Sequence, residues 1–329
     1  MKLPSKLHRA AAVAGMGVLF AVPGLAQAQA PAYPAKPVRI FVGFAPGGGI
    51  DIMARMAAQR MTESLGQSFI VDNRPGASGN IAAAQVAKSA PDGYTLLMTA
   101  DVHVITPGFT KDLPYDPVKD FAAIGTFVSG PQAITAHPSL PVRTLPELIA
   151  LAKKQPGIAY ASAGGGTLTH MAVELFRSMA GIKLLHVAYK GSGASVIAAI
   201  SGEVPLLSIA IGQATPHAKV GKLRILAVTS VKRWQLTPEI PTVSEVPGLA
   251  GYEAASWQGL LAPAGTPAAI VTRLNAEIDK MLQRRDMLDQ LVERAWVANP
   301  RTPQVFTEFM TREMAKWAKL IRESGLKAD

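Results

Sequence analysis

Short apolar runs and longer amphipathic stretches alternate along the chain from residue 38 onward. Continuous runs of Val, Ile, Leu and Phe are typical of strands buried in a parallel sheet, and apolar positions three or four residues apart are typical of the helices that cover it. The first series predicts strands at residues 38–44, 68–73 and 94–100, with helices at residues 50–65 and 80–89 between them.

A second series with the same alternation begins after Pro141. Strands that alternate with helices predict a mainly parallel sheet flanked by helices, so we expect two α/β units in succession. The predicted helices are residues 145–154, 169–180 and 194–201, with one more before the last strand, and the predicted strands are residues 158–163, 184–189, 204–210 and 223–229.

Two extended segments, residues 121–138 and 252–263, follow the first and second units respectively. We expect them to pair as crossovers and to hinge near Gly130–Pro131 and Ser256–Trp257. The chain then closes with two long amphipathic helices, predicted at residues 268–294 and 303–324, which cover one sheet.

These elements predict an α/β protein of two domains with a ligand cleft between them. The first domain is expected to comprise residues 31–130 plus 256–329, and the second residues 131–255. A length of 329 residues with 49% hydrophobic residues gives enough apolar surface for two such cores.

The N-terminal segment has the pattern of a secretory signal peptide. Lys2, Lys6 and Arg9 precede an alanine-rich apolar run that ends in small residues. Because proline past the scissile bond blocks cleavage after Ala30, we expect a signal peptide of residues 1–28 and a mature start at Gln29. The run is shorter than a membrane span and is interrupted by glycine and proline, which argues against an anchor. We therefore predict a soluble periplasmic protein.

The charge favours small anionic ligands over nucleic acid. Removing the three signal-peptide cations lowers the formal net charge from +10 to +7, and the remaining cations are scattered pairs without interleaved aromatic residues. The absence of cysteine excludes disulfides, thiol nucleophiles and thiolate metal sites. We expect a monomer.

Three glycine-rich turns follow predicted strands: VGFAPGGGID at residues 42–51, GGGTLTH at residues 164–170 and YKGSGAS at residues 189–195. The first lacks the spacing of a Walker motif or a dinucleotide fingerprint, which argues against nucleotide binding. A strand-to-helix turn still presents free N–H groups at a positive helix end, where a carboxylate can bind. The alternative is that glycine only makes each turn tight.

The predicted ligand-binding residues lie in and beside these turns. Asp51 has two interpretations, helix capping or ligand contact, and Trp257 is either core or one wall of the cleft. The full set is Phe44, Ala45, Pro46, Gly47, Gly48, Gly49, Asp51, Ser162, Gly164, Gly165, Gly166, Thr167, His170, Tyr189, Lys190, Ser192 and Ile209.

Signals for enzymes are weak. The chain has no G-x-S-x-G, no H-E-x-x-H and no EF-hand loop, and its other histidines are dispersed. His170 and Glu174 lie four residues apart on one helix face, but two ligands do not make a metal site. We expect no metal and no organic cofactor.

Ordered motifs across almost the whole mature chain resemble the Bug receptors, the substrate-binding proteins of tripartite tricarboxylate transporters. They include PVRIFVGFAPGGGIDIMAR, VDNRPGASGN, APDGYTLLM, ASAGGGTLTHMAVELFRSMAG, HVAYKGSGAS and LLAPAGTP. The resemblance implies a type II periplasmic-binding-protein fold that closes around a small organic acid and delivers it to a membrane permease. It also implies that one carboxylate is held by residues 44–49 and 162–167, partly through water, with His170 beside them.

One departure from this family bears on the ligand. Relatives often have an aromatic residue, Asp and Asn where this chain has Ser208, Ile209 and Ala210. If this strand end lines the cleft, the loss of a carboxylate predicts a ligand without an ammonium group, such as an aliphatic or aromatic mono- or dicarboxylate.

Two other hypotheses remain open at this stage. An exported hydrolase or isomerase could use the same cleft with His170 as the base, although the sequence shows no activated nucleophile. A variant of the receptor hypothesis is signalling, in which the closed form docks on a sensor kinase.

Overall fold

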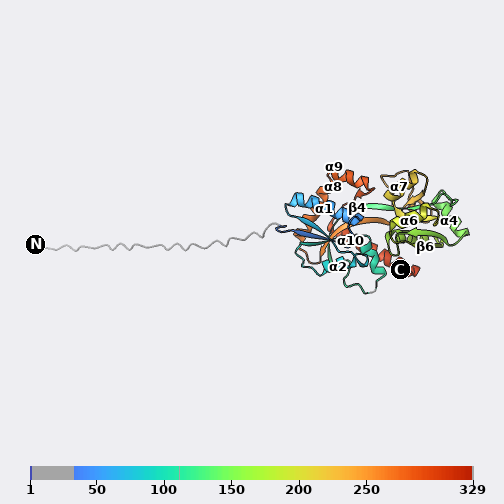
Figure 1. Ribbon diagram of the computed structural model, residues 1–329. Coiled ribbons are helices and arrows are strands. Elements are labelled where there is room, and N and C mark those ends of the chain that lie inside the picture. The colour runs from blue at the N-terminus through green and yellow to red at the C-terminus, as the bar shows by residue number, and fades with distance from the viewer. Residues whose placement is uncertain (2–32, 111, 328–329) are drawn as a thin grey trace. The chain divides into compact units, whose positions relative to one another are not determined.

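The computed structural model describes Met1, residues 33–110 and residues 112–327. Apart from Met1, the predicted signal peptide and the predicted start at Gln29 lie outside the described residues. The described residues from Tyr33 onward form one compact unit, whose elements are labelled in Figure 1. The described part of the chain contains no helix with the length and apolar character of a membrane span.

Two groups of strands meet at one long strand, β4 (Phe121–Ala136). In the first group β4 pairs with β9 and with the short β10, and β9 leads through β3 and β1 to the edge strand β2. Strands β1, β2 and β3 are mutually parallel, as the sequence pattern predicted. Their bounds are β1 Val38–Val42, β2 Phe69–Asn73, β3 Thr95–Ala100, β9 Ala255–Pro263 and β10 Val297–Ala298.

The second group pairs with the other half of β4. Strand β7 lies next to β4, followed by β5 and the edge strand β6, all three parallel to one another, and β8 pairs antiparallel to β4. Their bounds are β5 Ile158–Ser162, β6 Leu184–Ala188, β7 Leu206–Ala210 and β8 Arg224–Val228.

The predicted pairing of the two crossover segments is confirmed. Strands β4 and β9 run antiparallel from Phe121 opposite Pro263 to Pro131 opposite Ala255. Gly130 does not break β4 but lies inside it, directly opposite Ser256. The assignment of residues to two domains that hinge here stays a prediction.

The helices cover both groups of strands, and most follow the apolar periodicity closely. Helices α4 and α10 have the predicted bounds, whereas the single helix predicted over residues 268–294 is wrong, because the chain is extended at Arg284 and continues as two helices. The bounds are α1 Gly49–Leu65, α2 Asn80–Ala87, α3 Val102–Ile105, α4 Leu145–Lys154, α5 Leu168–Ala180, α6 Ser192–Ile200, α7 Ile211–Lys219, α8 Ala268–Leu282, α9 Arg285–Glu293 and α10 Pro303–Ser324.

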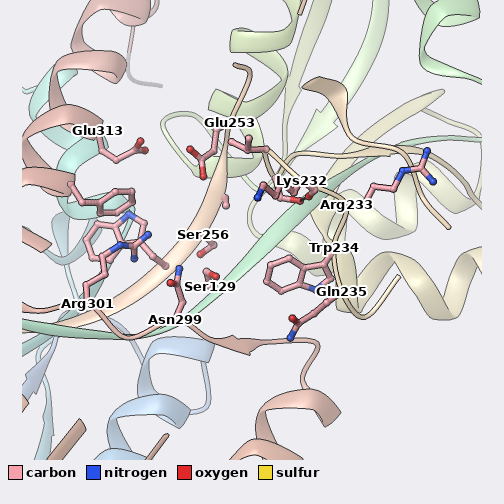
Figure 2. A pocket seen from close by; sticks show the side chains of 15 residues that line it. Ser129, Lys232, Arg233, Trp234, Gln235, Glu253, Ser256, Asn299, Arg301 and Glu313 are labelled. Carbon is pink, nitrogen blue, oxygen red and sulfur yellow. Dashed lines mark hydrogen bonds between the residues drawn. The ribbon is translucent and has the colours of Figure 1, made fainter. Parts of the chain in front are cut away.

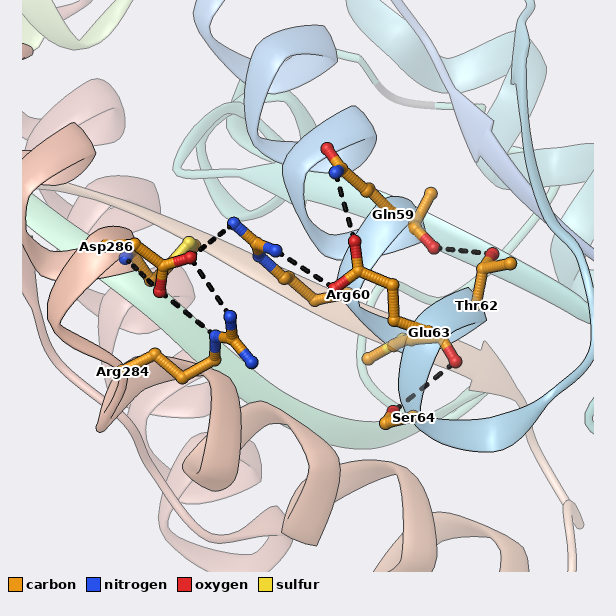
Figure 3. A network of polar contacts seen from close by, with 10 residues as sticks. Gln59, Arg60, Thr62, Glu63, Ser64, Arg284 and Asp286 are labelled. Carbon is orange, nitrogen blue, oxygen red and sulfur yellow. Dashed lines mark hydrogen bonds and ion pairs between the residues drawn. The ribbon is translucent and has the colours of Figure 1, made fainter.

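A polar network holds the start of α9, just after the junction with α8, next to α1 (Figure 3). Arg60 of α1 donates to Glu63 at 2.9 Å and to Asp286 of α9 at 2.8 Å, and Arg284 donates to the same Asp286. Beneath this network Met287 and Leu291 of α9 are buried in the core that α1 and α8 form on the first sheet. Burial of these apolar residues, worth about 1.5–3 kcal/mol each, favours the bent arrangement over one straight helix.

Strand directions place the carboxyl ends of both parallel groups toward the crossover. Strand β3 ends at Ala100, which lies opposite Gln258 of β9, and Gln258 lies opposite Val128 of β4. Strand β7 ends at Ala210, which lies opposite Gln132 of β4. These two levels are four residues apart, which corresponds to about 13 Å along β4. The turns that follow β1 and β5 therefore leave their sheets toward a common gap.

Candidate functional site

The first glycine-rich turn connects β1 to α1 and is organised by Asp51, whose side chain is 2% exposed. Its Oδ2 accepts from the Gly47 amide at 2.8 Å and from Arg55 Nε at 2.9 Å, and its Oδ1 accepts from Asn73 Nδ2 at 2.8 Å. Burial acts to raise the pKa of Asp51, but the hydrogen bonds outweigh it and hold that pKa below its ordinary value. The bond to Gly47 fits the capping interpretation: Asp51 shapes the turn, and both of its oxygens are engaged by the chain.

The same turn presents the start of α1 to the gap. Residues 45–49 are exposed, and Gly48 is the N-cap in an extended conformation. The amides of the first helical turn, from Gly49 onward, have no acceptor within a helix. Gly47 has φ +88°, a conformation that a residue with a Cβ rarely adopts. Backbone donors and a positive helix end therefore face the space beyond β1.

A neighbouring segment that the sequence analysis did not select supports this turn. A Cβ on Gly43 would lie 2.5 Å from the Cα of Gly79, so the two backbones touch. Ala77 and Ser78 have positive φ values, 46° and 55°, which are costly for residues other than glycine and concentrate at functional sites. Ser78 and Phe44 line one small hollow at the ends of β1 and β3. The only signal for this segment was its place in the motif VDNRPGASGN.

The second turn, between β5 and α5, is held by its own side chains. Thr167 is the N-cap of α5 and accepts from the His170 amide, and Thr169 Oγ1 accepts from the Ala163 amide at 3.0 Å. His170 Nδ1 accepts from the Gly166 amide at 3.1 Å. These hydrogen bonds within the chain fix the shape of the turn.

The side chains predicted to contact ligand at this turn lie largely beneath it. Ser162 is fully buried and bonds His186 Nε2 at 2.7 Å, and His170 is 3% exposed. The rings of His170 and His186 stack with centroids 3.9 Å apart, and Tyr160 stacks on His186. The structure thus places Ser162 and His170 as supports of the turn, and the half-buried backbone of Gly164–Gly166 as its accessible part.

The pair of His170 and Glu174 does not form a metal site. Glu174 is 2% exposed and accepts from Tyr160 Oη at 2.6 Å and from Arg177. Across the described residues, no group of three or more His, Cys, Asp or Glu is placed to hold a metal ion.

The third turn, after β6, packs against the second. The Gly191 amide donates to the Ala163 carbonyl at 3.1 Å, while Tyr189 Oη donates to Glu203. Lys190 is exposed and Ser192 begins α6. The structure therefore brings the second and third turns together at the ends of the neighbouring strands β5 and β6.

The sequence-based argument about Ile209 is wrong in its premise. Ile209 is 1% exposed and lies in an apolar cluster around β7, α6 and α7. The continuous apolar run identified β7 as a buried strand, but such a run does not show which of its side chains face the gap. Ala210 and Ile211, at the strand end, line the neighbouring hollows instead.

Two hollows lie along the gap. One of about 80 Å³ is lined at the crossover by Gln132, Trp257 and Gln258. The other, of about 830 Å³, reaches from Gly49 past Trp296 to the start of α7, which is within the size range of small-molecule sites. Sequence reasoning missed both glutamines, whose only signal was a polar residue inside an apolar crossover segment.

Comparison with known proteins identifies the family. Residues 53–326 match the family model described as the tripartite tricarboxylate transporter family receptor. Protein BugT from Bordetella pertussis is 33% identical over 96% of this chain and 98% of its own length. Among solved structures, R. palustris Rpa4515 with adipate is 35% identical with a TM-score of 0.77, covering 90% of this chain and 100% of that one.

A further solved structure, MatC from Rhodopseudomonas palustris with bound malate, is 29% identical with a TM-score of 0.73 and covers 88% of this chain and 100% of that one. These likenesses confirm the periplasmic-binding-protein fold, and they describe receptors rather than enzymes, so the enzyme hypothesis is not retained. The chain belongs to the tripartite tricarboxylate transporter receptor family, also called Bug receptors.

Proposed function

We propose that this receptor binds a small organic carboxylate in the gap between the ends of β1 and β5. The observation that carries the proposal is the pair of preorganised strand-to-helix turns whose backbone amides face the gap. An anion at a helix N-terminus is favoured both by unsatisfied N–H groups and by the helix dipole. The relatives with bound adipate and malate support an organic acid as the ligand class.

We further propose that the acid carries no ammonium group. This no longer rests on Ile209 but on the two aspartates that follow β1 and β3. Asp51 is saturated by three donors, and Asp101, which follows β3, accepts from Ser256 Oγ at 2.6 Å. Burial raises the pKa of Asp101 to about 6. Both aspartates are hydrogen-bonded within the chain, and Glu293, which lines the larger hollow, pairs with Arg294 at 3.7 Å; this favours aliphatic or aromatic mono- and dicarboxylates.

Export to the periplasm and delivery to a membrane permease complete the proposed function. The signal-peptide pattern and the family's transport role support both steps. Docking of the ligand-bound form on a sensor kinase is a variant that uses the same site.

A thermal-shift experiment on protein refolded after ligand stripping tests this function. Adipate, malate, succinate and benzoate form the panel, with aspartate and glutamate as controls. A ligand at one hundred times its Kd adds about 2.7 kcal/mol, which raises Tm by several degrees. A shift with one panel acid but not with the amino acids supports the proposal. A shift with amino acids alone contradicts the absence of an ammonium group, and no shift with any of the compounds contradicts the carboxylate site.

A further inference from the structure

A separate hollow of about 260 Å³ lies over the crossover between α10 and the loop after β8 (Figure 2). None of the predicted ligand-binding residues is among those that line it. Its walls come from both predicted domains: Asn299 and Arg301 follow β10, whereas Lys232 and Trp234 follow β8. We call it the crossover hollow.

Arg301 supplies a half-buried cation to the crossover hollow. Its guanidinium carbon stacks 4.0 Å from the centre of the Phe309 ring, and Nη1 lies 3.4 Å from Thr126 Oγ1. Among the described residues, no carboxylate lies within the 4.0 Å of an ion pair with it. Burial lowers the pKa of Arg301, although Glu253 and Glu313 partly offset this effect. A guanidinium that keeps most of its N–H groups free in a hollow suits an oxygen anion.

Trp257 gives a second, independent indication that the crossover hollow binds a hydrogen-bond acceptor. Its side chain is 1% exposed and packs edge-on against Phe306 and Phe309. The buried indole Nε1 has no hydrogen-bond acceptor among the described residues, although Trp257 lines the hollow. A buried donor without an acceptor costs about 1–3 kcal/mol, so an acceptor bound here would remove that cost.

The remaining charges around the hollow leave a positive excess. Glu313 is engaged by Lys316 at 2.6 Å and by the Trp317 indole, and Arg233 pairs with Glu245. Lys232 and Arg301 then face one carboxylate, that of Glu253, and within the described chain neither cation forms an ion pair with it. Figure 2 shows Arg301 and Asn299 on one side of the strands and Lys232 on the other.

We propose that the crossover hollow is a second binding site, for a small oxyanion held by Arg301 and the indole N–H of Trp257. Its chemistry fits a phosphate or a carboxylate group. It shares Ser129, Ser256 and Trp257 with the smaller hollow of the gap, but none of the predicted ligand-binding residues, and it does not depend on the identity of the transported acid. An occupant would be held by groups from both predicted domains.

The indole N–H signals of the four tryptophans, assigned in a ¹⁵N–¹H spectrum of the full protein, test this site. Inorganic phosphate and acetate are the probes, titrated separately at constant ionic strength. We expect the Trp257 signal to move and to saturate with at least one probe, while the Trp296 signal, which reports on the gap, stays in place with phosphate. Saturation with phosphate alone identifies an inorganic-type oxyanion, and saturation with acetate alone identifies a carboxylate.

Variants of the cation distinguish a built site from a general salt effect. Arg301→Met should abolish the saturable shift, and Arg301→Lys, which keeps the charge but not the fork of donors, should weaken binding about tenfold. Arg322→Met, an exposed position in the last turn of the same helix, should leave the shift unchanged. No saturable shift in the unmodified protein, or the same shift in Arg301→Lys as in the unmodified protein, overturns the proposal.

Discussion

Replacing Asp51 with asparagine removes the charge at the centre of the first turn while keeping its volume. The amide oxygen of the new side chain can still accept from Gly47 and Arg55, but its NH₂ group then faces the NH₂ group of Asn73. A flip of Asn73 does not help, because Asn73 Nδ2 also donates to the Phe44 carbonyl at 3.0 Å and its Oδ1 accepts from Arg55. Every arrangement leaves at least one buried polar group without a partner.

The expected cost combines that unsatisfied group, about 1–3 kcal/mol, with the weaker uncharged hydrogen bonds, about 1 kcal/mol. A loss of about 3 kcal/mol lowers Tm by roughly 5 °C for about 300 folded residues, at an unfolding entropy of about 2.1 cal/mol/K per residue. Asp72→Asn is the matched control: Asp72 pairs with Arg39 and Arg74 near the surface, where such pairs contribute about 1 kcal/mol or less.

Urea denaturation of the two variants measures both free energies of unfolding. The expected order is a large loss for Asp51→Asn and a small one for Asp72→Asn. Equal losses, or a fully stable Asp51→Asn, would refute the idea that Asp51 shapes the turn. If the turn forms the site, Asp51→Asn should also weaken binding of the panel acid.

Two further predictions concern this side of the gap. Gly43→Ala should destabilise the protein strongly, because the new Cβ would meet the Gly79 backbone. Gly48→Ala should be near neutral, because its Cβ would have its nearest contact at 3.7 Å. Equal melting temperatures of the two variants would contradict this prediction. Burial raises the pKa of Asp101 to about 6 and lowers that of His103 to about 4. As the pH rises from about 4 to 6, the raised pKa of Asp101 lowers the free energy of unfolding. As the pH rises from about 4 to 6.5, the lowered pKa of His103 increases the free energy of unfolding. Asp101→Asn should leave only the His103 contribution, so that its free energy of unfolding rises between pH 4 and 6.5; a flat profile in urea titrations would contradict this.

Local pattern was enough to predict every strand except β10, and most helices, because these depend on neighbouring residues; the pairing of the crossovers followed from their extended pattern after each α/β unit. The break at Arg284 was not predictable in this way, since neither glycine nor proline marks it. It depends on contacts with Arg60, more than two hundred residues away in sequence. Tertiary packing overrides helical periodicity at this point.

The site was predictable to the level of its turns but not of its side chains. Glycine-rich strand ends identified residues 44–49 and 162–167 as backbone donors. Sequence could not distinguish a side chain that supports a turn from one that projects beyond it, so Ser162 and His170 were placed among the ligand-binding residues and Asp51 was left between helix capping and ligand contact. In the structure all three side chains are buried and hydrogen-bonded within the chain, and their contact with a ligand stays a prediction.

The measurement that tests the central claim most directly is the affinity of Gly49→Pro for the best panel acid, by titration calorimetry. Gly49 is the first residue of α1 and Gly48 before it is extended, so proline fits the backbone and removes only one N–H. Gly49→Ala is the matched control, since it places the same Cβ 3.2 Å from Trp296 but keeps the amide. We predict about 10- to 100-fold weaker binding for Gly49→Pro than for Gly49→Ala, as expected for a lost hydrogen bond to a charged group. Equal affinities of the two variants would contradict a carboxylate held by this turn.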